Sequence, residues 1–391
     1  RDSGGSNWNF SGTPVLEDVT LTAYWVAEQF TLEAGGTYYF DLSAAGVPGT
    51  RCSNLPDTTL HYVPFTYTGT IEAYVLNSNS WKVPGASEEA SKTTEGDNAK
   101  YGYVYPHSLF IADYVLTNYV GCQRLKENNW VFGGKDFKAG GITYSVRIPS
   151  GGSRAIGPSD PRNNEWDVIL DKNGGWIKNV GRAAWVQDTY RDFSDSNIHR
   201  GGHGARHAVG RMRGYSSDDV GFRPVLQPRD PETLGADALK PVTLNLGGAT
   251  LADGTDLLQI IVKQGASFAA PAAEGLTAPA DAVSGSFRWE DRNGKAYQPG
   301  ETVPADVNYL CARWNTETHT LTTGKTYYFD LSGSNLPGEA NQALPDPTLH
   351  YVPFTYAGDL DAYVLTPASA GQTASSSQAA AAADAGVQLR Q

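Results

Sequence analysis

The sequence has 391 residues, and at roughly 150 residues per domain this length predicts two or three domains. Gly (43 residues), Tyr (21) and Trp (9) are abundant while charged residues make up only 18%, a balance that favours modules of strands and turns over helical ones. The formal net charge of −12 repels phosphate backbones and anionic membranes, so nucleic acid is a poor partner.

The first predicted strands lie at the start of the longest β-rich region. Tyr38–Leu42, Leu60–Val63 and Ile71–Leu76 are short runs of β-forming residues separated by turns with Pro and Gly, so each predicts a strand. The polar stretch Asn77–Lys100 then predicts a loop or a mobile insertion.

Regular structure is expected again after Lys100. His107–Tyr114 fits either a strand or a helix, whereas Ile142–Ile148 alternates as a strand should. In Asn164–Asp171 the apolar residues recur at helical spacing and Asn173-Gly-Gly follows, which predicts a short helix.

The hydrophobic periodicity disappears from Trp185 to Asp219, where Gly residues interrupt a mixture of Arg, His, Asp and aromatic side chains. We therefore expect a long irregular loop. Val220–Leu226 predicts a strand that closes it, with Pro224 at an edge, a bulge or the strand's end because Pro cannot donate a ladder hydrogen bond. Alternation along that strand places Phe222 in the core and Arg223 on the opposite face.

A small separate β domain is predicted near the C-terminal end. Val242–Leu246, Asp256–Lys263, Gly285–Glu290 and Val307–Trp314 each predict a strand, and Asn293-Gly294 is a turn signal between the last two.

The sequence contains one internal repeat. Thr37–Leu76 (the first repeat) and Thr326–Leu365 (the second repeat) align without a gap and are identical at 26 of 40 positions, so the order of modules is itself repeated. The biased tail over 367–391 has no partner sequence to pack on, and we expect it to be disordered or adventitiously helical.

Spaced tryptophan motifs carry a resemblance to a known fold. Asn164-Glu-Trp-Asp, Trp176-Ile-Lys-Asn and Trp185-Val-Gln-Asp, followed by Val220-Gly-Phe-Arg-Pro-Val-Leu, resemble C-type lectin-fold proteins of the formylglycine-generating-enzyme-like superfamily, in particular the variable proteins of diversity-generating retroelements. That superfamily ends its domain on a Gly-Phe-Arg strand, and its variable members carry the diversified positions just upstream. The resemblance implies a ligand-binding lectin-type module over 35–228.

A second resemblance covers the predicted β domain. Val242–Trp314 looks like the Listeria–Bacteroides repeat, a small β-grasp-like module of surface proteins that ends in a Thr-Leu-x-Ala-x-Trp strand. It implies a β-grasp-like repeat over 240–315 and a partial one over 1–25, while 324–366 would be a partial second copy of the lectin module's opening strands. The expected fold class is mainly β, with an α+β C-type lectin-like module plus a small β-grasp-like repeat.

Candidate ligand-binding residues crowd into the irregular segment. Arg forks and amphipathic rings serve as interface anchors, although a solvated charged loop is the blander interpretation, since five Arg offset five Asp there. The resemblance favours binding, and we expect exposed side chains on one face from Tyr190, Arg191, Phe193, Asp195, His199, His203, His207, Arg211, Arg213 and Tyr215.

Metal sites and cofactors are not expected. His199, His203 and His207 lie four residues apart, but the Gly residues between them make a common helical face improbable, so they predict exposed imidazoles instead of a Zn²⁺ site. The tripeptides of calcium-dependent sugar binding are missing. Cys52, Cys122 and Cys311 lie far apart without CxxC spacing, which argues against zinc ribbons and disulfide scaffolds.

Enzyme activity is not expected either. The segment Asn164–Leu226 contains no Cys for formylglycine chemistry, and neither a hydrolase elbow nor a dinucleotide fingerprint is present. Paired carboxylates stay open as a glycosidase alternative, although Glu165 and Asp167 flank Trp166 and should point to different faces.

The expected function is recognition at a surface. The chain is interpreted as a secreted or cell-surface, adhesin-like protein whose partner is a protein or glycan on another cell or phage. Residues 1–25 lack the pattern of a signal peptide, and no run of 18 apolar residues predicts a membrane span. The alternatives are an architectural repeat of a long surface stalk and a formylglycine-generating-like enzyme with altered chemistry.

Overall fold

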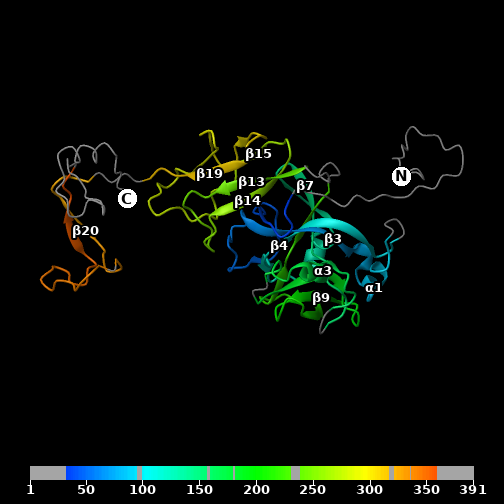
Figure 1. Ribbon diagram of the computed structural model, residues 1–391. Helices are drawn as coiled ribbons and strands as arrows, with labels where there is room; N and C mark the ends of the chain where they lie inside the picture. Colours follow the sequence, from blue (N-terminus) through cyan, green and yellow to red (C-terminus); the bar gives the residue numbers. More distant parts are fainter. Residues whose placement is uncertain are drawn as a thin grey trace. The chain divides into compact units, whose positions relative to one another are not determined.

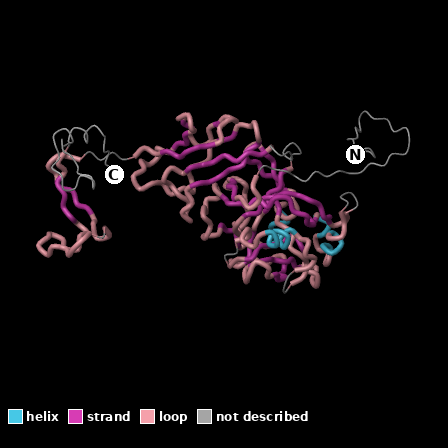
Figure 2. Tube along the Cα trace, in the orientation of Figure 1, coloured by secondary structure: helices cyan, strands magenta, loops and turns pink. Residues whose placement is uncertain are grey.

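The computed structural model describes residues 32–94, 99–155, 159–178, 181–229, 238–316, 321–334 and 336–358. The chain divides into two compact units, Arg1–Thr316 and Glu317–Gln391 (Figure 1). Strands and loops dominate and the helices are short, so the mainly β expectation is confirmed (Figure 2). The regions expected as a partial module at 1–25 and a disordered tail at 367–391 lie outside the described residues.

Two six-stranded sheets build residues 32–229. The first has the order β1-β3-β4-β12-β7-β6, with β1 (Thr37–Phe40), β3 (Val63–Leu76), β4 (Gly102–Ala112), β12 (Val225–Pro228), β7 (Ile142–Arg147) and β6 (Lys135–Ala139). The second has the order β10-β9-β8-β11-β5-β2, with β10 (Ala208–Met212), β9 (Ser196–Gly201), β8 (Ala183–Thr189), β11 (Val220–Phe222), β5 (Thr117–Asn118) and β2 (Thr50–Arg51).

The strand expected over Leu60–Val63 is displaced. Leu60 has a φ of 68°, a left-handed conformation that a strand does not tolerate, so β3 begins at Val63. β3 then runs through the predicted strand Ile71–Leu76 and pairs with β4 on both sides of a bulge between Tyr67 and Thr70. His107–Tyr114 is resolved as strand, because most of it lies in β4.

The helices are few and local. α3 (Glu165–Lys172) confirms the predicted helix, and its N-cap Asn164 accepts a hydrogen bond from the Asp167 backbone N–H. The segment expected as a loop, Asn77–Lys100, instead contains a 3₁₀ turn, η1 (Ser78–Ser80), and the helix α1 (Ala86–Ala90). α1 was missed because its buried face consists of small residues and gives no hydrophobic periodicity. The other helix in the described part of the chain is α2 (Cys122–Glu127).

The irregular loop expected over Trp185–Asp219 contains most of three strands, β8, β9 and β10. Every residue of β8 and β9 is buried, including Gln187, Asp188, Asn197 and Arg200, so polar side chains occupy positions where a strand usually shows hydrophobic residues. The expectation was wrong because the polar interior of this region removes the alternation that identifies strands.

The single closing strand expected over Val220–Leu226 is two strands in two sheets. β11 pairs with β8 and β5 in the second sheet, and β12 pairs with β4 and β7 in the first. The break falls at Arg223 and Pro224, as the missing N–H of Pro requires. Arg223 is buried, and its guanidinium donates to the carbonyl oxygens of Ala112 (2.8 Å), Asp113 (2.6 Å) and Lys178 (2.7 Å).

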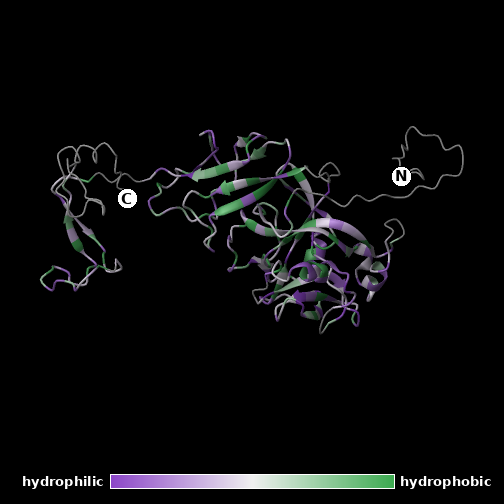
Figure 3. Cartoon of the chain, viewed as in Figure 1, coloured by the Kyte–Doolittle hydropathy of each residue, from purple (hydrophilic) through white to green (hydrophobic). Residues whose placement is uncertain are grey.

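Residues 238–316, here called the β-module, contain a five-stranded sheet and a two-stranded ribbon. The order β14-β13-β19-β16-β17 joins β14 (Leu257–Lys263), β13 (Leu239–Asn245), β19 (Tyr309–Arg313), β16 (Arg288–Glu290) and β17 (Ala296–Tyr297), and β15 (Phe268–Ala269) pairs with β18 (Thr302–Val303). Much of the sheet is hydrophobic (Figure 3), and the four predicted strands are all found. A core around Trp289 belongs to this module, while Leu239 and Ile261 join the core of residues 32–229.

The described residues of the second unit contain one hairpin. β20 (Thr326–Phe329) pairs antiparallel with β21 (Val352–Thr355) in the register that β1 and β3 show in the first repeat, so Tyr327 faces Phe354 as Tyr38 faces Phe65. Repeated sequence therefore gives repeated local structure. Within the described residues of both units, no helix has the length and apolar character needed to cross a membrane.

Phe222 tests the placement of β11. Its ring is buried and meets Trp130 edge to face with 5.3 Å between centroids. We expect Phe222→Ala to lower the free energy of unfolding by about 3–5 kcal/mol, through lost transfer energy and an unfilled cavity. Thermal and urea melts measure this, with the exposed Phe193→Ala as the matched control, and a Phe222→Ala melt equal to that of the parent chain would refute the placement.

Candidate functional site

The ten predicted surface residues lie in one continuous stretch from the end of β8 through β9 and β10. Five are exposed, namely Arg191, Phe193, Asp195, His203 and Arg211, and three are half-buried, namely Tyr190, His207 and Tyr215. His199 and Arg213 are buried, which contradicts their predicted exposure. The structure thus divides the predicted residues into an exposed or half-buried set of eight and a buried pair.

His199 is buried because it lies in the middle strand β9. Its ring meets Trp185 edge to face with 5.7 Å between centroids, and neither ring nitrogen has a hydrogen-bond partner among the described residues. Burial, together with the nearby charge of Arg211, lowers the pKa of His199 to about 4. The imidazole is therefore neutral at pH 7 and acts as a packing group.

Arg213 fixes the end of the segment. Its guanidinium stacks over the Trp81 ring at 4.2 Å from the centroid, and its Nε donates to the Asn197 side-chain oxygen at 2.9 Å. Burial lowers the pKa of Arg213. This side chain connects β9 to the turn that carries Trp81, so it supports the segment from within.

The exposed part has an aromatic corner. The rings of Tyr190 and Phe193 lie 5.5 Å apart, and Arg191 forms an ion pair with Glu88 at 2.7 Å. At the other end, the Arg211 guanidinium lies 5.2 Å from the centroid of the Tyr215 ring. Rings and guanidinium groups thus lie at both ends of the segment, the mixture that serves as interface anchors.

Exposed apolar side chains mark the same region. In the described part of 32–229, the large hydrophobic side chains that stand exposed are Tyr119 (56%), Phe193 (59%) and Met212 (66%). Met212 pairs with Ser196 across β10 and β9, and the Tyr119 backbone N–H donates to the Ser217 carbonyl oxygen at 2.9 Å. All three therefore lie in, or are hydrogen-bonded to, the stretch from 190 to 217. We call Tyr119, Phe193 and Met212 the apolar triplet.

Two members of the apolar triplet were missed from the sequence. A signal for Met212 was available, because it is the one Met of the chain and stands between two Arg. Tyr119 had no such signal. It directly follows β5, which lies about ninety residues before β10 in the sequence, and it meets the segment only through tertiary contacts such as its hydrogen bond to Ser217.

The carboxylates kept open as catalytic groups are sealed inside the module. Glu165 receives two hydrogen bonds of 2.6 Å from the Arg147 guanidinium and lies 2.8 Å from the His107 Nε2. Asp167 pairs with Arg200 at 2.7 Å. Burial raises the pKa of Glu165, but the charge of Arg147 outweighs it and holds that pKa at about 2. Both carboxylates are fully buried, which makes them structural.

The three histidines do not converge. The rings of His203 and His207 lie 5.3 Å apart, whereas His199 packs on Trp185. Across the described stretches of the chain, no three His, Cys, Asp or Glu side chains are grouped so that they could hold a metal ion.

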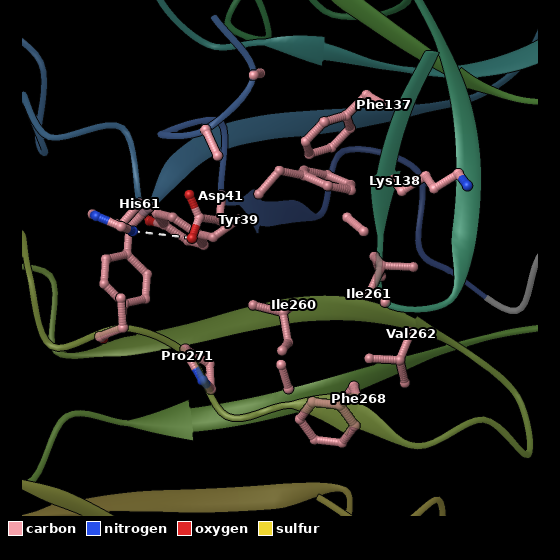
Figure 4. Close-up of a pocket in the computed structure, with 18 of the residues that line it drawn as sticks. Tyr39, Asp41, His61, Phe137, Lys138, Ile260, Ile261, Val262, Phe268 and Pro271 are labelled. Carbon is pink, nitrogen blue, oxygen red and sulfur yellow. Dashed lines mark hydrogen bonds and ion pairs between the residues drawn. The ribbon is translucent and has the colours of Figure 1, made fainter. Parts of the chain in front are cut away.

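A cavity of about 670 Å³ lies where the first repeat meets the β-module. Tyr39, Asp41 and His61 line one wall, and Ile260 and Phe268 line the other (Figure 4). Its polar pair, His61 Nδ1 and Asp41 Oδ2 at 3.0 Å, recurs in the second repeat at 3.2 Å. That pair therefore belongs to the turn of the repeat, and we assign no ligand to the cavity.

Comparison of the chain with protein-family models, with curated proteins and with solved structures found no match.

The low pKa of His199 makes stability depend on pH with a defined sign. Between pH 6.5, the ordinary value, and about 4 the unfolded chain binds a proton that the folded chain does not, so stability falls as pH falls through this window. His199→Phe removes that loss, and we expect its free energy of unfolding relative to the parent chain to rise between pH 7 and pH 4.5 in urea melts. The control is His203→Gln, which changes an exposed histidine. If the difference in unfolding free energy between His199→Phe and the parent chain is the same at pH 7 and pH 4.5, the assignment is wrong.

Proposed function

We propose that this chain is a secreted or cell-surface ligand-binding protein, in which a C-type lectin-like module over 35–228 presents the stretch from Tyr190 to Tyr215 as its recognition surface. The observation that carries the proposal is the apolar triplet. Contiguous exposed apolar surface marks interaction sites, and the three side chains of the triplet are carried by this segment or by a residue hydrogen-bonded to it. Here they coincide with the segment in which the sequence resemblance puts recognition.

The support beneath this surface favours binding over an idle loop. Asp188 accepts hydrogen bonds from the Tyr74 hydroxyl (2.6 Å) and from the Gly151 backbone N–H (2.7 Å), and Arg200 pairs with Asp167. These buried contacts hold β8 and β9 in place. A rigid base lowers the entropy lost when exposed side chains become ordered on binding.

The chemistry of the surface favours a protein or a glycan partner. Arg191 and Arg211 are exposed beside Asp192 and Asp195, so neither sign of charge prevails. The exposed rings of Phe193 and Tyr119 can stack on a sugar face or enter an apolar pocket of a protein. An enzyme is less well supported, because the three cysteines are buried and Glu165 and Asp167 are sealed by their arginine partners.

Diversification is part of the proposal. In the family that the sequence resembles, variable positions lie just upstream of the closing Gly-Phe-Arg, which corresponds here to the exposed residues between 190 and 215. Sequencing the locus in related strains tests this directly. We expect codon differences concentrated at exposed residues such as Phe193 and Arg211, with a reverse transcriptase gene nearby, and near-identical segments in all strains would favour the stalk alternative.

Recognition is tested with paired surface variants. We expect Phe193→Asp combined with Met212→Asp to weaken binding at least tenfold, because large apolar anchors usually dominate an interface. The measurement is binding of the full chain to a glycan array, to intact bacterial cells and to phage particles.

Leu257→Asp is the matched control, since Leu257 is similarly exposed but lies in β14 of the β-module. If the double variant binds whatever the parent chain binds with the same affinity, the recognition surface lies elsewhere.

A further inference from the structure

The first repeat uses a small set of residues to contact the β-module. The Tyr62 hydroxyl donates to the Ala272 carbonyl oxygen, and the Ala252 backbone N–H donates to the Pro56 carbonyl oxygen at 3.1 Å. Tyr62 is a member of the β-module's core cluster, and Tyr39 packs against that cluster. Both tyrosines belong to the repeat by sequence and to the neighbouring module by packing.

The same residues recur in the second repeat. Tyr328, Pro345 and Tyr351 are identical to Tyr39, Pro56 and Tyr62, respectively, at a constant offset in the alignment of the two repeats. The chain conformation is kept as well, since Leu349 has the φ of 66° that matches the 68° of Leu60.

The supporting hydrogen bonds of the turn also recur. The Asp346 carboxylate accepts from the backbone N–H of Tyr351 at 2.8 Å, as Asp57 does from Tyr62. The second repeat therefore presents its tyrosines on the same local scaffold.

The two sets differ in what covers them. Tyr62 is 1% exposed, whereas Tyr351 is 68% and Tyr328 64% exposed. Pro56 is buried and Pro345 is exposed. The tyrosines that pack against the β-module core in the first repeat are therefore uncovered apolar surface in the second.

We propose that Tyr328, Pro345 and Tyr351 form a docking surface for the β-module of a second copy of this chain. The first repeat shows which partner fits: the β-module core that contains Phe268 and takes in Tyr62, and a carbonyl oxygen placed like that of Ala272. In each copy the first repeat occupies this face, so docking in trans is an exchange in which the second repeat takes the place of the first. This proposal does not depend on the recognition surface at 190–215.

The two repeats compete for the same face of the β-module, and this competition determines which variant reveals docking in trans. Both repeats offer the same contact residues, but the first repeat is held close to its own β-module and has the higher local concentration. In the parent chain the first repeat therefore occupies the β-module face. Weakening the contact between the first repeat and its own β-module should let the second repeat of another copy bind there. Tyr351 would then become buried, and its loss of exposure reports the binding.

The experiment compares Tyr351 protection in three full-length chains: the parent, Tyr62→Ala, and Tyr62→Ala with Tyr351→Ala. Oxidative labelling of Tyr351 is read by mass spectrometry at low and high protein concentration, and sedimentation velocity reports mass. We expect Tyr351 in the Tyr62→Ala chain to become several-fold less reactive as concentration rises, together with dimers, while the double variant stays monomeric.

A second variant guards against misfolding of Tyr62→Ala. The Gly140 backbone carbonyl accepts from the Lys263 N–H at 2.7 Å, and a Cβ at Gly140 would lie 2.1 Å from the Ile261 carbonyl oxygen. Gly140→Ala thus loosens the same interface from another side, and we expect it to protect Tyr351 in the same way.

Two outcomes overturn the proposal. If Tyr351 stays as reactive in both variants as in the parent chain, the surface does not bind a β-module. If protection appears without any dependence on concentration and without dimers, the occupant is not a second copy. Loss of ligand binding at 190–215 would leave both readouts unchanged, so the two proposals fail separately.

Discussion

Two buried carboxylates at the start of α3 connect the two sheets of residues 32–229. Glu165 and Asp167 lie on either side of Trp166, and each is neutralised by a buried arginine from a different sheet, Arg147 of β7 and Arg200 of β9. Removing one partner of such a pair typically costs about 3–5 kcal/mol, because an uncompensated charge is left without water. The helix therefore joins the two sheets by charge as well as by packing.

The exposed stretch from Tyr190 to Tyr215 inherits its rigidity from this arrangement. Arg200 ties β9 to α3 through its hydrogen bond to Asp167. β9 in turn pairs with β8 on one side and with β10 on the other. Residues that looked like binding groups in the sequence, His199 and Arg213, serve the same purpose through Trp185 and Trp81. Exposed side chains such as Phe193 add little to this support, since the contacts that hold the strands lie in the buried layer beneath them.

The two repeats separate local from tertiary causes. The same sequence forms the same hairpin register, the same left-handed leucine and the same Asp–His pair in both units. In the first repeat Phe40 and Phe65 are core residues, and in the second Phe329 and Phe354 keep the 5.2 Å ring contact while both are exposed. Local sequence sets the shape of the turn, whereas burial depends on what the rest of the chain brings to it.

The sequence by itself determined the mainly β class, the helix α3 with its Asn164 cap, the repeat and the strands of the β-module, because these depend on propensity and periodicity within a few residues. Only the tertiary structure decided that Val220–Leu226 divides between two sheets and that 185–219 forms strands with a polar interior. It also decided that Tyr119 is hydrogen-bonded to the segment that carries Phe193 and Met212. Buried arginines and carboxylates read as surface residues in a sequence, since their partners lie far along the chain and become visible only once the sheets assemble.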